Sequence, residues 1–243
     1  MNIKILTLFP EVITAYTRAS IVGRAQDKGL VAIEAINFRD FALNRHGSVD
    51  DAPFGGGKGM VLTPEPLARA IREIREKELV VYLSPKGRPL TQEMAMTLSR
   101  ETGLIMVCGH YEGVDERFIS TYVDLEISIG DYVLSGGELG ALVLTDAITR
   151  LIPGVLSEGS LEEESFTRYL LEYPQYTRPR IFEGQPVPEV LLSGNHRHIE
   201  DFRLEAAIRQ TLLKRPDLIE EGIAKEVFDS KTLDLITRLK KTL

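Results

Sequence analysis

Short apolar runs alternate along the first half of the chain with stretches in which apolar residues recur at helical spacing. Apolar runs of about four to eight residues are typical of strands buried on both faces of a parallel sheet. Their alternation with helical patterns predicts an α/β fold around a mostly parallel sheet. The strands expected from this pattern are residues 3–9, 31–37, 79–83, 104–108 and 125–129.

Helix signals lie between these strands. Thr63 and Pro64 stand at the start of one apolar-periodic stretch, Thr91 precedes another, and Pro153 follows the last. These residues are typical of helix caps and helix stops. The helices predicted for this half are residues 11–28, 64–74, 92–100, 115–122 and 138–152.

Three of the expected strands lead into turns, at residues 84–87, 109–113 and 129–137. The last turn lies in S-I-G-D-Y-V-L-S-G-G-E-L, residues 128–139, whose glycines let a backbone approach a ligand without an intervening side chain. In an open α/β sheet the carboxyl ends of parallel strands share one edge, where ligands bind. Each turn alone is ordinary, but the three together predict a pocket for a nucleotide-like ligand.

A long polar, glycine-rich segment, residues 39–59, separates the second and third expected strands. A phosphate-binding loop needs Ser or Thr directly after its Lys, and here Lys58 is followed by Gly59. Loops this long inside compact domains are usually functional. We therefore expect a mobile loop over a substrate.

The composition and the hydrophobic pattern of the sequence change after Pro153. We expect a first domain at residues 1–156, an acidic interdomain linker at 157–164, and a smaller, mostly helical domain at 165–243. Helical patterns in the last part predict helices at residues 199–213, 217–226 and 231–243.

Composition narrows the class of protein. Hydrophobic residues make up 43% and charged residues 27% of the 243 residues, as in an ordinary globular protein, and no apolar run is long enough for a membrane span. The net charge of −7 argues against indiscriminate nucleic-acid binding, although basic residues slightly outnumber acidic ones between residues 165 and 215. Cys108 is alone within an apolar run, so we expect a buried thiol, not a nucleophile, and a reducing, cytoplasmic location.

Six segments in order resemble one family, the bacterial tRNA (guanine-N1)-methyltransferases, whose members modify the base 3′ of the anticodon. Because the segments cover nearly the whole chain, the resemblance is far more specific than any single glycine motif. The segments are L-T-L-F-P-E at 6–11, F-G-G-G at 54–57, Y-L-S-P at 82–85, C-G-H-Y-E-G-V-D-E-R at 108–117, the stretch 128–139, and Y-P-Q-Y-T-R-P at 173–179 with L-L-S-G-N-H at 191–196.

The resemblance implies an enzyme that transfers a methyl group from S-adenosylmethionine to N1 of that guanine in tRNA. It also implies the SPOUT methyltransferase fold with a C-terminal trefoil knot, a homodimer whose active site lies at the subunit interface, and magnesium as an assisting ion. Knots are nearly absent from proteins, so this feature rests on the resemblance alone. Two other functions stay open as hypotheses: a SPOUT enzyme for another RNA position, and a non-catalytic RNA module that binds a nucleotide.

The resemblance assigns the cofactor pocket to the three turns. Their backbone groups can read an adenine edge, apolar side chains can sandwich the ring, and Glu112 can accept from the ribose hydroxyls. The implied S-adenosylmethionine residues are Tyr82, Leu83, Ser84, Pro85, Gly109, Tyr111, Glu112, Ile129, Gly130, Asp131, Tyr132, Val133, Leu134, Gly136 and Gly137.

For the reaction, a carboxylate must remove the proton from guanine N1. The family uses an aspartate directly before Ser-Phe, and this chain has Glu164 there, with Asp146 and Glu163 as alternatives. Arg150 matches the family's arginine, which is suited to stabilising negative charge on guanine O6. Two further departures, Gly140 for proline and His110 for arginine, remove no group to which a role is assigned.

Contacts to tRNA are expected in the second domain, where side chains can position the phosphate backbone or read a base edge. The candidates are Glu172, Arg178, Arg180, His196, Arg197 and Arg203. His196 and His198 lack further ligands nearby, so no protein metal site is predicted.

Overall fold

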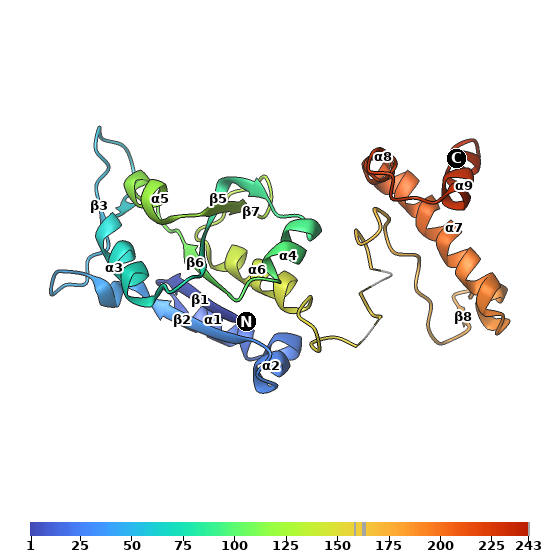
Figure 1. The fold of residues 1–243 in the computed structure, drawn as a ribbon, viewed down its shortest axis with the longest axis horizontal. Helices are drawn as coiled ribbons and strands as arrows, with labels where there is room; N and C mark the ends of the chain where they lie inside the picture. The colour runs from blue at the N-terminus through green and yellow to red at the C-terminus, as the bar shows by residue number, and fades with distance from the viewer. Residues whose placement is uncertain (158, 162–163, 243) are drawn as a thin grey trace. The chain divides into compact units, whose positions relative to one another are not determined.

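The computed structural model describes residues 1–157, 159–161 and 164–242. The chain divides into two compact units, Met1–Ser157 and Glu158–Leu243 (Figure 1). Glu163 and part of the expected linker at residues 157–164 lie outside the described residues.

A five-stranded parallel sheet forms the centre of the first unit, with the order β2-β1-β6-β5-β7. This confirms the expected α/β fold with a mostly parallel sheet. Figure 1 traces it from the blue β1 and β2 to the green β5, β6 and β7. The strands are β1 (Asn2–Thr7), β2 (Ala32–Asn37), β5 (Leu79–Pro89), β6 (Gly103–Cys108) and β7 (Leu125–Ser128), and a separate antiparallel pair is formed by β3 (Asp50–Asp51) and β4 (Val61–Leu62).

Helices cover both faces of the sheet. Alternate residues of β6 point to opposite faces, and because both sets are apolar, each face forms a core with the helices that cover it. On one face Met106 belongs to a core with Leu144 of α6, and on the other Val107 packs with Phe118 of α5. The helices are α1 (Pro10–Thr17), α2 (Ser20–Asp27), the 3₁₀ helix η1 (Phe38–Phe41), α3 (Pro64–Ile74), α4 (Gln92–Leu98), α5 (Glu116–Tyr122) and α6 (Glu138–Thr149).

Two expectations about these elements were wrong. The helix predicted at 11–28 is two helices, because the chain turns at Ser20, whose φ is +53°. The turn predicted at 84–87 is instead part of β5, which runs on to Pro89 with a register shift against β7 between Leu83 and Arg88. Such a shift marks a bulge, which keeps a strand in the sheet while bending it.

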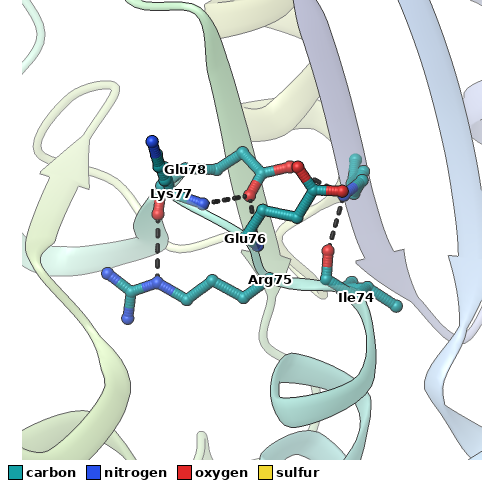
Figure 2. Close-up of polar contacts among 6 residues, drawn as sticks. Ile74, Arg75, Glu76, Lys77 and Glu78 are labelled. Carbon is teal, nitrogen blue, oxygen red and sulfur yellow. Dashed lines mark hydrogen bonds and ion pairs between the residues drawn. The ribbon is translucent and has the colours of Figure 1, made fainter.

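An ion pair links β1 to the turn between α3 and β5 (Figure 2). Lys4 Nζ donates to Glu78 Oε1 at 2.6 Å and to the carbonyl oxygen of Ile74 at 2.5 Å. Glu78 Oε2 accepts from the backbone N–H groups of Glu76, at 2.7 Å, and Lys77, at 3.0 Å. Burial alone would raise the pKa of Glu78, but these donors outweigh it and lower the pKa to about 2.

The second unit is mostly helical. Its described residues form helices that pack around Ile208, Ile219, Ile236 and Leu239. Its elements are the hairpin strands β8 (Ile181–Phe182) and β9 (Gln185–Pro186), the 3₁₀ helix η2 (Glu189–Leu192), α7 (His196–Lys214), α8 (Pro216–Ala224) and α9 (Ser230–Lys240). Within the described ranges, no helix combines the length and the apolar character needed to cross a membrane.

Candidate active site

A cavity of about 270 Å³ opens at the carboxyl edge of the sheet, where β5, β6 and β7 are neighbours. The structure brings all the expected cofactor residues to its wall except Asp131, which is exposed. The residues at the wall are Tyr82, Leu83, Ser84, Pro85, Gly109, Tyr111, Glu112, Ile129, Gly130, Tyr132, Val133, Leu134, Gly136 and Gly137.

Backbone contacts hold the segment after β7 against the turn after β6. The N–H of Gly137 donates to the carbonyl oxygen of Gly109 at 2.8 Å, and His110 forms an antiparallel bridge with Gly136. A side chain at position 137 would lie only 2.7 Å from Cα of Cys108. Only glycine allows this approach, which places two of the three turns in direct contact.

The segment after β7 is stiffened by its own side chains. Ser128 Oγ accepts from the N–H of Gly130 at 3.2 Å and donates to its carbonyl oxygen at 3.1 Å. The Tyr132 hydroxyl donates to the carbonyl oxygen of Ile129 at 3.1 Å. The turn leaves Val133 86% exposed at the cavity wall, so an apolar surface is available to a flat ligand ring.

Two titratable side chains next to the cavity stay protonated at neutral pH. Burial, reinforced by the charge of Glu126, raises the pKa of Tyr82 to about 12. Burial, reinforced by the charge of Glu138, raises the pKa of the Cys108 thiol well above its usual range. Cys108 is free and buried, as expected, and neither side chain is placed to act as a base or nucleophile.

Further residues line the cavity without having been expected. His110 lies between aromatic neighbours, with ring centroids 5.3 Å from Phe9 and 5.0 Å from Tyr111. The position of His110 inside the expected turn 109–113 could have predicted it as a lining residue. The buried apolar residues below the turns have no comparable signal in the sequence. The additional lining residues are Lys86, His110, Gly113, Val114, Ile119, Ile127, Ser128, Ser135 and Gly140.

The candidate reaction residues belong to different units. Arg150 is half-buried at the C-cap of α6 in the first unit, one turn after Asp146, whose Oδ2 accepts from the Tyr16 hydroxyl at 2.6 Å. Glu164 is half-buried in the second unit and lines a cavity of about 360 Å³ there. The alternative Glu163 lies outside the described residues.

The candidate tRNA residues all lie in the second unit. Arg178 and Arg180 are exposed just before and at the start of the β8–β9 hairpin, and His196 and Arg197 are exposed in the first turn of α7. Glu172 and Arg203 line the same cavity as Glu164. The Arg203 guanidinium lies 4.7 Å from the Tyr173 ring centroid.

No group of three or more His, Cys, Asp or Glu side chains suited to a metal ion occurs among the described residues. Magnesium as an assisting ion thus rests on the family resemblance alone.

Comparison with known proteins gives one consistent result. The model of the family "tRNA (Guanine-1)-methyltransferase TrmD" matches residues 1–221. The chain is 54% identical to the tRNA (guanine-N(1)-)-methyltransferase of Treponema denticola, over 91% of this chain and 92% of that one. It is 54% identical to that of Staphylococcus epidermidis, over 100% and 99%, and 55% identical to that of Alkaliphilus metalliredigens, over 90% and 92%.

Proposed function

The chain belongs to the tRNA (guanine-1)-methyltransferase family, and on that premise we propose which of its residues carry out the reaction. It is a tRNA (guanine-N1)-methyltransferase that uses S-adenosylmethionine. The finer proposal is that the target is the guanine 3′ of the anticodon, and that the enzyme acts in the cytoplasm, where tRNA is modified. The observation that carries the proposal is the convergence, around one cavity, of residues 82–86 of β5 and the segments that follow β6 and β7.

The cavity of the first unit is the proposed binding site for the methyl donor. Its wall offers backbone N–H and C=O groups from the turns 109–113 and 129–137, and apolar side chains such as Leu83 and Leu134. These groups fit an adenosine, because an adenine has a polar edge and apolar faces. Glu112 is the proposed acceptor for the ribose hydroxyls, and Asp131 stays part of the proposal although it lies outside the cavity wall.

When bound, S-adenosylmethionine supplies an electrophilic methyl group on a sulfonium. The protein must then free the guanine N1 lone pair by accepting its proton, and Glu164 is the proposed general base. As the methyl group bonds to N1, the N1 proton passes to the Glu164 carboxylate, and the methyl–sulfur electron pair stays on sulfur. Arg150 is proposed to stabilise the negative charge that deprotonation places on guanine O6.

The tRNA is proposed to lie on the second unit. Exposed Arg178, Arg180 and Arg197 suit the phosphate backbone, since guanidinium groups pair with phosphate oxygens. His196 belongs to the same exposed helix start. Glu172 and Arg203 line the second cavity, where a carboxylate and a guanidinium suit a nucleobase edge.

The proposal includes a homodimer. Two neighbouring helices leave apolar side chains exposed one turn apart: Val12 and Tyr16 on α1, and Leu139 and Val143 on α6. The Tyr16–Asp146 hydrogen bond joins these helices, so the four side chains belong to one face. An apolar face of this kind supports an interface, here with a second copy of the chain.

A trefoil knot in the first unit is the finer part of the fold proposal. It is supported by the close passage of Gly137 along Cys108 and Gly109, which brings the chain after β7 tightly against the exit of β6. Close passage of two chain segments is necessary for threading.

The function is tested by radiolabelled methyl transfer from S-adenosylmethionine onto tRNA transcripts. We expect label on a transcript with guanine 3′ of the anticodon, and none when that guanine is replaced by adenine. A 7-deaza-guanine substitution at the same place serves as the control, because it leaves N1 intact. Label retained on the adenine transcript would contradict the proposed target.

A further inference from the structure

The segment from residue 39 to 59, called the arm, is the feature that the proposed reaction leaves without a role. It runs between η1 and β4 and is drawn at the left edge of the first unit, around β3 (Figure 1). Phe54 near its end is 98% exposed and Leu43 is 72% exposed. Val49, in the middle of the arm, is fully buried in the core of the first unit and holds the arm there, so the exposed parts lie on either side of it.

The C-terminal end of the arm is joined to the turn after β6, which forms part of the cavity wall. The N–H of Glu112 donates to the carbonyl oxygen of Met60 at 3.0 Å, and the N–H of Leu62 donates to that of Gly113 at 2.9 Å. The N–H of Asp115 in turn donates to the carbonyl oxygen of Leu62 at 3.0 Å. Residues 60–62 thus run along residues 112–115 as a short strand-like pair.

Gly59 precedes this pair and lies directly against the Glu112 side chain. A methyl group at position 59 would overlap Oε1 and Cγ of Glu112 and lie 2.8 Å from its Cδ. Glu112 is an exposed residue of the cavity wall, and among the described residues none donates a hydrogen bond to its carboxylate. The Glu112 side chain therefore lies across the bare backbone of Gly59, where a methyl group would displace it.

We propose that Gly59 is a positioning residue: its missing side chain lets Glu112 lie across the arm backbone, with its carboxylate held for the methyl donor. This inference rests on the proposed function, in which Glu112 accepts from the ribose hydroxyls. A long exposed glutamate loses rotamer freedom when it binds a ligand, and prior restriction by packing reduces that loss. The glycine of the arm thereby sets donor affinity without lining the cavity itself.

The test compares alanine substitutions at two glycines of the arm. Gly59 has φ +83° and Gly56 has φ +79°, so alanine strains the backbone equally at both positions. No atom lies within 4 Å of the place where the Gly56 methyl group would be. Gly56→Ala is therefore a matched control that reproduces the strain without touching Glu112.

Donor affinity of the full-length variants is measured by calorimetry with S-adenosylmethionine. We expect Gly59→Ala to weaken binding about tenfold, as for loss of one hydrogen bond to a charged group, and Gly56→Ala to leave it unchanged. In steady-state kinetics the effect falls on the KM for the donor, not on kcat. In a Glu112→Ala background, Gly59→Ala adds no further loss, because the side chain it displaces is absent.

Two results would overturn the inference while leaving the proposed function intact: equal donor affinity for Gly59→Ala and Gly56→Ala, or an undiminished Gly59→Ala effect in the Glu112→Ala background. Wild-type protein that binds no donor would overturn both. Thermal unfolding of both glycine variants shows whether they remain folded, and we expect equal small decreases in Tm.

Discussion

The Tyr16 hydroxyl donates a 2.6 Å hydrogen bond to Oδ2 of Asp146, and this contact joins α1 to α6. The hydrogen bond to Asp146 is the main cause that raises the pKa of Tyr16. Asp146 thus already has a structural partner within the first unit. We propose a structural role for Asp146, beside the proposed role of Glu164 as the base that deprotonates guanine N1.

Substitution of the two acids separates these roles. We expect Glu164→Gln to lower methyl transfer under single-turnover conditions by about 10²-fold or more, the usual contribution of a general base. Asp146→Asn keeps an oxygen for the Tyr16 hydroxyl and is expected to retain most of the activity. Calorimetry should show unchanged S-adenosylmethionine binding in both variants. Full activity of Glu164→Gln together with an inactive Asp146→Asn would reverse the assignment.

Arg150 is expected to act through its charge. Arg150→Ala should lower turnover by about 10²-fold, the size of effect seen when one donor to a developing anion is removed. Arg150→Lys keeps the charge and is expected to recover part of this loss. Single-turnover rates with saturating tRNA and donor measure both variants, and equal rates for the alanine and lysine variants would argue against a role for charge.

Gly137 is expected to tolerate no side chain. Gly137→Ala places a methyl group against the backbone of Cys108, so we expect a loss of stability of about 1–3 kcal/mol together with weaker donor binding. Gly140→Ala is the matched variant, since its methyl group would meet only Leu83 side-chain atoms, the nearest at 3.3 Å. Urea denaturation compares the two, and an equally stable Gly137→Ala protein would contradict the close passage.

Glu78 predicts a specific dependence of stability on pH. The pKa of Glu78 is about 2 in the folded state, below the usual value of 4.5. Its contribution to the free energy of unfolding is therefore present above pH 4.5 and is lost as the pH falls towards 2. The shift corresponds to about 3 kcal/mol. Glu78→Gln should therefore show a smaller fall in the free energy of unfolding across this window than the wild type. Parallel pH curves for the two proteins would show that the pKa of Glu78 is not lowered in the folded state.

The apolar face of α1 and α6 predicts the assembly state. We expect Val143→Glu, which places a charge in that face, to convert a dimer into a monomer in sedimentation velocity experiments. Leu213→Glu is the control, because Leu213 is 63% exposed on α7 and outside this face. A wild-type monomer, or a Val143→Glu dimer of unchanged stability, would remove the support for the interface.

Much of the candidate site could be predicted from sequence because its parts are local. The apolar run of β6 indicates a buried strand, the turn that follows it is visible in His110 to Gly113, and the helix α6 begins where the glycines end. Each of these signals depends on residues within a few positions of one another. The alternation of such runs was enough to predict the parallel sheet and the edge at which the turns meet.

Contacts between distant residues were decided only by the tertiary structure. The pairing of Lys4 with Glu78, the passage of Gly137 along Cys108, and the packing of Glu112 across Gly59 leave no periodic trace in the sequence. The continuation of β5 beyond Leu83 was also missed, because Arg88 and Pro89 pair with β7 again after the register shift, and local turn preference does not show this. The physical reason is the same for these three contacts and for the strand continuation. Hydrophobic periodicity and turn preference depend on residues close together in the sequence, whereas close approach depends on which segments the folded sheet brings together.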